Sequence, residues 1–155
     1  MAAEARPDGQ DPHELGRFAA AQEDTIDAVR QELRAGRKAT HWMWFVFPQV
    51  EGLGSSPMAR RYAIGSLDEA VAYLEHPVLG PRLRECSALL LDVEGASIER
   101  ILGTPDDLKL RSSMTLFALV SEPGSVYERV LERFFEGSLD LATQAVLKRW
   151  AAGRR

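Results

Sequence analysis

The sequence predicts an all-α protein: a single compact domain of about seven to eight helices, rather than a simple up-down four-helix bundle. Apolar residues recur at helical spacing over most of the chain. Residues that typically begin a helix stand directly before these stretches, and glycine or proline follows them. No stretch shows the sustained alternation of apolar and polar residues that a half-buried strand would have.

The length and composition fit one globular domain. A chain of 155 residues is long enough to bury a single hydrophobic core. Its composition, 45% hydrophobic and 27% charged, argues against disorder. Residues 1–10 are small, polar and turn-forming, so we expect a disordered N-terminal tail there. The helical domain is expected to span residues 11–155, because no repeat or linker interrupts it.

The first third of the chain predicts helix followed by an aromatic segment and a loop. Residues 13–35 carry a helical pattern with a break near Asp24, and Gly36 is the expected stop. The apolar run 41–47 is too short for its periodicity to distinguish helix from strand, and Pro48 ends it. Residues 51–57, with two glycines, two serines and a proline, predict a loop.

Capping signals divide the rest of the chain into further helices. Ser66 with Glu69, and Ser125 with Glu128, form two capping boxes, each at the start of an apolar-periodic stretch. The first helix is expected to end before a proline and the second at a glycine. The remaining expected helices are 81–93, ended by Gly95; 97–102, ended by Gly103; and 139–150.

One more helix is expected to lie at the centre of the molecule. Thr104 is its predicted N-cap and Pro105 its first residue, with acidic residues in the first turn. The chain then becomes apolar on all sides over 114–120. A helix that is apolar all round is buried, so this one should form the middle of the core.

Charge, cysteine count and missing motifs exclude several classes of function. The formal net charge is −4 and the sequence pI about 5.4, so no nucleic-acid partner is expected. The N-terminus lacks a signal peptide and no apolar run could span a membrane, which predicts a cytoplasmic protein with no membrane partner. The lone Cys86 suits a reducing compartment and is expected to be a small buried hydrophobe. No phosphate loop or metal-ligand spacing occurs, so neither a metal nor a cofactor is predicted.

The aromatic segment is the first candidate site. It holds Trp42 and Trp44, two of the three tryptophans of the chain, between His41 and Gln49. Aromatic rings beside a histidine and an amide are able to stack on a planar ligand and hydrogen-bond its edge. The alternative interpretation is a core anchor whose polar tips are satisfied by the protein itself.

Residues 106–113 are the second candidate site. On a helix, Asp106, Lys109 and Ser113 share one stripe, and Ser112 lies beside it. The Lys109 ammonium would hold an anion and the two hydroxyls would supply hydrogen bonds. Arg111 points elsewhere on an ideal wheel but is able to pair with a carboxylate. The alternative is an internal network of ion pairs at the polar end of a core helix.

A third candidate lies in the turn at residues 76–82. His76 and Arg82 flank two prolines, which make the turn rigid enough to aim both side chains into a cleft. The alternative is that His76 caps the end of a helix.

Several strings of the sequence are long and unusual. They are Arg17-Phe18, Ala21-Gln22, Gly36-Arg37-Lys38, His41 to Trp44, Phe47-Pro48-Gln49, Gly52-Leu53-Gly54, His76 to Leu83, Asp106 to Phe117, and Gly137 with Asp140 and Thr143. In this order, over about residues 14–150, they resemble the uncharacterised family DUF1810. The resemblance implies a mainly α-helical single domain and assigns no biochemical activity. Some members carry a calpastatin label, but such inhibitors are disordered repeats, and this chain has a core and no repeat.

Two hypotheses of function follow. In the first, residues 41–49 and 106–113 meet around one cleft and bind a nucleotide-like or other anionic small molecule, with His41 or Asp106 as a candidate catalytic acid–base group. The ligand-binding side chains would come from these segments, joined by His76 and Arg82. In the second, the aromatic segment is the docking surface of a non-catalytic interaction module. The sequence leaves enzymatic activity and oligomeric state open.

Overall fold

Ten α-helices and no β-strand make up residues 11–153, the part of the chain that the computed structural model describes. The all-α prediction is confirmed, with a helix count slightly above the expected seven to eight. The tail expected at residues 1–10 lies outside the described residues. In chain order the helices are α1 (Gly16–Glu23), α2 (Ile26–Ala35), α3 (Met43–Val46), α4 (Pro57–Arg61), α5 (Leu67–Glu75), α6 (Leu79–Asp92), α7 (Ile98–Leu102), α8 (Asp106–Leu119), α9 (Val126–Phe135) and α10 (Leu141–Gly153).

The first third of the chain follows the sequence pattern closely. The helical region 13–35 is broken at Asp24 into α1 and α2, as predicted. Gly36 ends α2 with φ +73°, a left-handed conformation that glycine adopts without steric cost. The aromatic run, ambiguous from sequence, forms the single helical turn α3, which stops before Pro48.

The predicted serine caps at the starts of α5 and α9 are present, but the predicted threonine cap of α8 is not. The Ser66 hydroxyl accepts the Glu69 amide at 3.0 Å, and the Ser125 hydroxyl accepts the Glu128 amide at 3.2 Å. The prediction that Thr104 caps α8 is wrong, because the helix begins at Asp106 and has no side-chain cap. Backbone carbonyls of the preceding turn close its start instead: the Asp107 amide, for example, bonds the Gly103 carbonyl at 2.9 Å.

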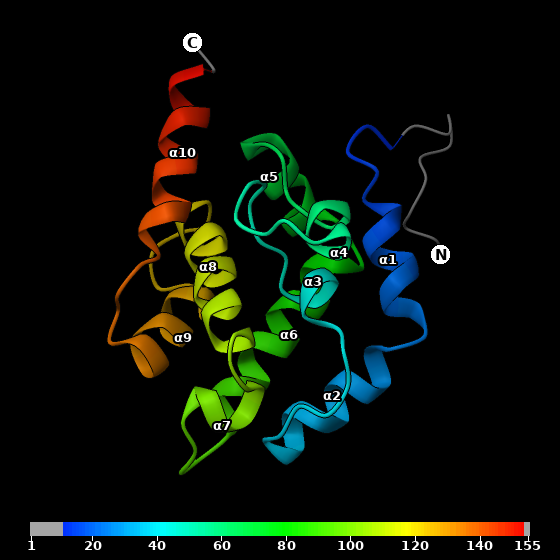
Figure 1. Cartoon of the computed structure of the whole chain (residues 1–155), viewed down its shortest axis with the longest axis vertical. Coiled ribbons are helices and arrows are strands. Elements are labelled where there is room, and N and C mark those ends of the chain that lie inside the picture. Colours follow the sequence, from blue (N-terminus) through cyan, green and yellow to red (C-terminus); the bar gives the residue numbers. More distant parts are fainter. Residues whose placement is uncertain (1–10, 154–155) are drawn as a thin grey trace.

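Helix α8 lies in the middle of the molecule, as its apolar sequence predicts. It packs against α3, α5, α7, α9 and α10 (Figure 1). Met114, Leu116 and Phe117 on this helix are fully buried. The Phe117 ring lies 5.4 Å from the ring of Tyr73 on α5 and 5.9 Å from that of Tyr127 on α9. These aromatic contacts join three helices into one core.

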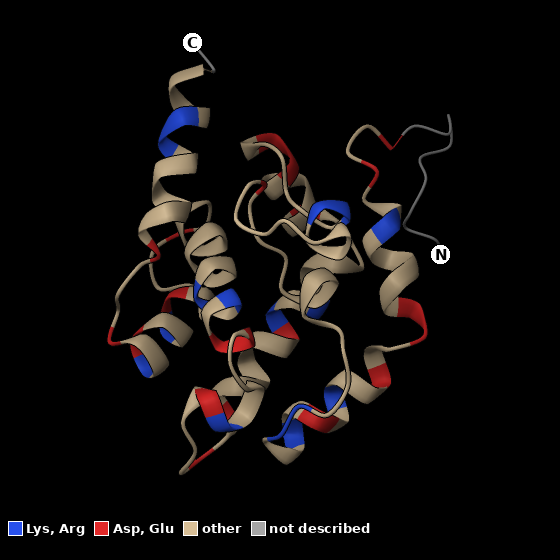
Figure 2. Cartoon of the chain, viewed as in Figure 1, with Lys and Arg blue, Asp and Glu red and all other residues tan. Residues whose placement is uncertain are grey.

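The surface and the single cysteine are consistent with the sequence analysis. Acidic and basic residues are mixed along α2, α7 and α9 rather than separated by sign (Figure 2). Every helix within residues 11–153 is too short or too polar to cross a lipid bilayer. Cys86 is fully buried on α6, as expected, and burial raises the pKa of its thiol to about 12.

Candidate functional site

The structure brings the two main candidate segments together at one contact between α3 and α8. The Lys109 ammonium lies 5.1 Å from the centroid of the Trp44 ring. Trp44 is the least buried residue of α3, since Met43, Phe45 and Val46 are all in the core. A cation over an indole face is attracted by the negative charge of the π-cloud, with a gain of about 0.5–1 kcal/mol at an exposed position.

A chain of alternating charges runs from this contact into the protein. One carboxylate oxygen of Asp106 lies 3.4 Å from the Lys109 ammonium, and the other lies 2.9 Å from the Lys38 ammonium. The Lys38 side chain is only 8% exposed, against 26% for Lys109. Lys38 also lies over the Trp42 ring, 5.2 Å from its centroid. Asp106 therefore pairs more closely with the buried Lys38 side chain than with the more exposed Lys109.

Glu32, on α2, anchors the loop that carries Lys38 and Trp42. Its carboxylate accepts the Ala39 amide at 2.8 Å, the Thr40 hydroxyl at 2.7 Å and amide at 3.1 Å, and the Trp42 indole N–H at 2.9 Å. Partial burial opposes ionisation, but these bonds outweigh it and lower the pKa of Glu32 from 4.5 to about 2. We call Glu32, Lys38, Trp42, Trp44, Asp106 and Lys109 the Trp–Lys cluster.

The lowered pKa of Glu32 makes a testable contribution to stability. Because its folded pKa lies below the unfolded value, the contribution is complete above about pH 4.5 and is lost as pH falls toward 2. Glu32→Gln should lower the free energy of unfolding by about 1–3 kcal/mol at neutral pH, since an amide oxygen replaces a charged acceptor of four donors. In urea titrations at several pH values, the gap between wild type and variant should close below pH 4.5. A gap independent of pH would contradict this role.

Several predicted site residues have structural partners or lie apart from the cluster. Within residues 11–153, the side chains of His41 and Gln49 make no hydrogen bond or ion pair, and nothing joins them to Lys109. Arg111 donates to the Ser138 hydroxyl and to the carbonyls of Ser138 and Leu139, so it fastens the α9–α10 connection to α8. Both serines are buried: Ser112 donates to the Leu108 carbonyl at 3.3 Å, and the Ser113 hydroxyl has no partner among the described residues.

In the third candidate, the turn at residues 76–82, His76 forms hydrogen bonds at the start of α6. The Nδ1 atom of His76 accepts the amides of Val78 and Leu79 at 3.1 and 3.2 Å. Arg82 donates to the Gln22 side chain of α1 at 3.3 Å. Val78, Leu79 and Gln22 all lie outside the Trp–Lys cluster.

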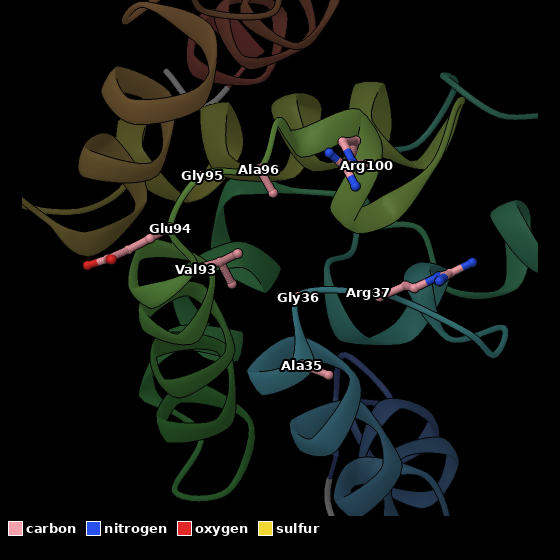
Figure 3. Close-up of a pocket in the computed structure, with 8 residues that line it drawn as sticks. All are labelled: Ala35, Gly36, Arg37, Val93, Glu94, Gly95, Ala96 and Arg100. Atoms are coloured by element: carbon pink, nitrogen blue, oxygen red, sulfur yellow. The ribbon is translucent and has the colours of Figure 1, made fainter.

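A cavity of about 540 Å³ adjoins the cluster, between the ends of α2 and α6 and the start of α7. The Lys38 amide donates to the Ile101 carbonyl at 2.7 Å, so Arg37 and Arg100 lie on adjoining stretches of backbone. Figure 3 shows Arg37 and Arg100 on one side of the cavity and Glu94 on the other, with the Arg37 and Glu94 side chains both directed outward. Two guanidinium groups and one carboxylate therefore line this cavity.

Sequence reasoning missed two members of the cluster, Glu32 and Lys38. Both occupy positions where a solvated charge is the ordinary expectation, near the C-terminal end of α2 and in the loop after it. The adjacency of Lys38 and Asp106 depends on a contact between residues 68 positions apart, which helical periodicity does not encode. Asp106 was one of two candidates for an acid–base group, and in the structure its carboxylate pairs with two lysines.

Comparison with known proteins assigns the fold to a family without assigning an activity. The family model described as "Protein of unknown function (DUF1810)" matches residues 12–147. The chain belongs to the DUF1810 family. Among solved structures, it is similar to the conserved hypothetical protein Rv1873 from Mycobacterium tuberculosis, at 55% identity and a TM-score of 0.87, over 89% of this chain and 99% of that one. The comparison with curated proteins returned no match.

The DUF1810 match confirms the resemblance seen in the sequence. The matched range contains all six residues of the Trp–Lys cluster. Among the described residues of this DUF1810 protein, no group of three His, Cys, Asp or Glu side chains is placed to hold a metal ion.

Proposed function

We propose that this DUF1810 protein binds a small nucleotide-like anion at the exposed end of the Trp–Lys cluster, where Trp44 and Lys109 meet. The observation that carries the proposal is the unequal pairing of the two lysines. The Lys38 side chain is 8% exposed and its ammonium lies 2.9 Å from one oxygen of Asp106, whereas the Lys109 side chain is 26% exposed and its ammonium lies 3.4 Å from the other oxygen. An ammonium has three N–H donors, so Lys109 keeps donors for an anion.

Trp44 gives the proposed ligand its second feature, a planar ring. The indole of Trp44 is partly exposed beside the ammonium, so a flat ring attached to an anionic group is able to contact it. Arg37, the residue before Lys38, and Arg100 line the cavity of Figure 3 and add positive charge to that part of the surface. Trp42 is fully buried and its N–H is bonded to Glu32, so its role in this proposal is to support Lys38.

The interaction-module alternative has less support from the geometry. Trp42, Phe45 and Phe47 of the aromatic segment are buried, which leaves little aromatic surface for a partner. The flat patch of two exposed tryptophans that this hypothesis needs does not form among the described residues. We therefore favour the small-molecule site.

Calorimetric titration with adenosine 5′-monophosphate tests the proposal. Adenosine, which lacks the anion, and inorganic phosphate, which lacks the ring, should each bind at least about tenfold more weakly, a difference of about 1.4 kcal/mol. Lys109→Ala should weaken binding of the monophosphate by a similar factor. The variant should change the free energy of unfolding by less than about 1 kcal/mol, since Asp106 remains paired with Lys38.

The matched control is Lys148→Ala, which removes an exposed lysine from α10. It should leave both affinity and stability unchanged. Absence of saturable binding to the wild type, or equal affinity of the Lys109 and Lys148 variants, would overturn the proposal. A loss above about 3 kcal/mol in the Lys109 variant would instead identify a structural ion pair.

A further inference from the structure

A second cavity, unrelated to the Trp–Lys cluster, lies at the start of α9. Its volume is about 470 Å³, within the range of small-molecule sites. The end of α5, the middle of α6 and the turn between α8 and α9 surround it. It shares no residue with the Trp–Lys cluster or with the cavity of Figure 3.

Two guanidinium groups line this cavity, Arg84 from α6 and Arg129 from α9. Both arginines are exposed, and neither forms an ion pair with a carboxylate within residues 11–153. A guanidinium binds a carboxylate or phosphate through two parallel hydrogen bonds. The cavity therefore offers strong donors for an anion that the protein itself does not supply.

The start of α9 adds positive potential from the backbone. The ten residues of α9 begin directly at the cavity, with Ser125 as N-cap and Val126 and Tyr127 in the lining. The first amides of a helix have no acceptor within the helix and carry the positive end of its dipole. One carboxylate, Glu122, also lies in the lining. Against two arginines it leaves a net positive charge there.

A buried hydroxyl independently points to a missing acceptor. The Tyr127 side chain is 3% exposed and lines the cavity, and its hydroxyl proton has no acceptor among the described residues. Burial raises the pKa of Tyr127 to about 12, although the charge of Arg84 and a hydrogen bond from its guanidinium lower it, so the group keeps its proton. Arg84 is only a donor, so it cannot accept that proton in a hydrogen bond. An anion can.

We propose that this cavity binds a small organic anion, with the anionic group between Arg84 and Arg129 and an apolar body against Leu74, Val120 and Val126. The apolar side chains line the same cavity as the arginines, so one ligand is able to contact both. The shared chemistry fits an aromatic or short aliphatic carboxylate and the corresponding phosphate ester. Without a bound anion, the buried Tyr127 hydroxyl proton has no acceptor, which lowers the stability of the free protein.

Nitrogen-15 NMR titrations with benzoate and with phenyl phosphate test this site and distinguish the two anionic groups. Saturable shifts should appear at the amides of residues 121, 122 and 124–129 and around Arg84, beyond those in sodium chloride of equal ionic strength. Inorganic phosphate, without an apolar body, should bind at least about tenfold more weakly than phenyl phosphate. Arg84→Gln and Arg129→Gln should each weaken binding by about tenfold or more.

Two further variants keep the result interpretable. Arg149→Gln, on an exposed position of α10, should bind as wild type does. Tyr127→Phe should weaken binding without lowering the melting temperature, because it removes a buried donor that lacks a partner. Shifts no larger than those in sodium chloride, or equal affinities for the Arg129 and Arg149 variants, would overturn the proposal. Neither outcome bears on the Trp–Lys cluster, whose test uses Lys109.

Discussion

Replacing Arg17 by alanine is expected to lower the free energy of unfolding by about 3–5 kcal/mol, because the change leaves a buried carboxylate without its counter-ion. Arg17 pairs with Glu69 at 2.9 Å, and the Glu69 side chain is 9% exposed. In the variant, that carboxylate keeps one hydrogen bond, from the Gly65 amide at 2.8 Å. For a domain of this size the melting temperature should fall by roughly 6–20 °C.

The effect should be large because Arg17 also fastens two backbone segments to α1. Its guanidinium donates five hydrogen bonds, four of them to carbonyl oxygens in the turn before α1 and at the end of α4. Those carbonyl groups lose their donor at the same time as Glu69 loses its partner. The acceptors, in chain order, are the carbonyls of His13, Glu14, Arg61 and Ala63 and the Glu69 carboxylate.

Arg30→Ala is the matched control. Arg30 pairs with Glu85 and Asp27, but these side chains are 37% and 96% exposed, so the loss should be under about 1 kcal/mol. Adding Glu69→Gln to Arg17→Ala should restore part of the stability by removing the uncompensated charge. Equal losses for the Arg17 and Arg30 variants in urea titrations would contradict this account.

Local signals of the sequence were sufficient for the helices but not for every helix boundary. The capping boxes at Ser66 and Ser125 and the stop at Gly36 depend on residues within four positions, so they survive in any tertiary context. The aromatic run could not be assigned, because a single turn such as α3 has no period to detect. Thr104 failed as a cap because the preceding carbonyls already close the first turn of α8.

The candidate site was predictable only where the sequence gathers unusual residues. Trp44 and Lys109 stood out because indoles and a lysine interrupt apolar stretches, and the structure places them in contact. The partners that govern their chemistry could not be foreseen. Glu32 and Lys38 acquire their roles from contacts across the fold, and the pairing that buries Lys38 leaves Lys109 the more exposed of the two lysines. Periodicity identifies which face of a helix is polar, but not what that face meets.

Replacing Gly80 by alanine is expected to destabilise the protein by about 3 kcal/mol or more, the upper end of what overpacking costs. A Cβ at this position would lie 2.2 Å from the Leu74 carbonyl oxygen and 3.1 Å from its carbon. Both are backbone atoms of α5, so no side-chain rotation relieves the overlap. Gly80 is buried in the first turn of α6, and its amide donates to the His76 carbonyl at 3.0 Å. The start of α6 would have to move away from α5.

The control for Gly80 is Gly153→Ala, at the end of α10, where an added Cβ meets nothing within 4 Å. That change should be neutral or stabilise by up to about 1 kcal/mol, since alanine favours helix more than glycine does. The same helix preference applies at Gly80, so the difference between the two variants isolates the steric cost of approaching Leu74. Gly80 lies where α5 is joined to α6, in the segment 76–82 that also holds His76 and Arg82. The NMR signals of this junction should therefore shift in the Gly80 variant. A melting temperature within about 2 °C of wild type, which corresponds to under about 1 kcal/mol, would show that α5 and α6 are able to separate freely.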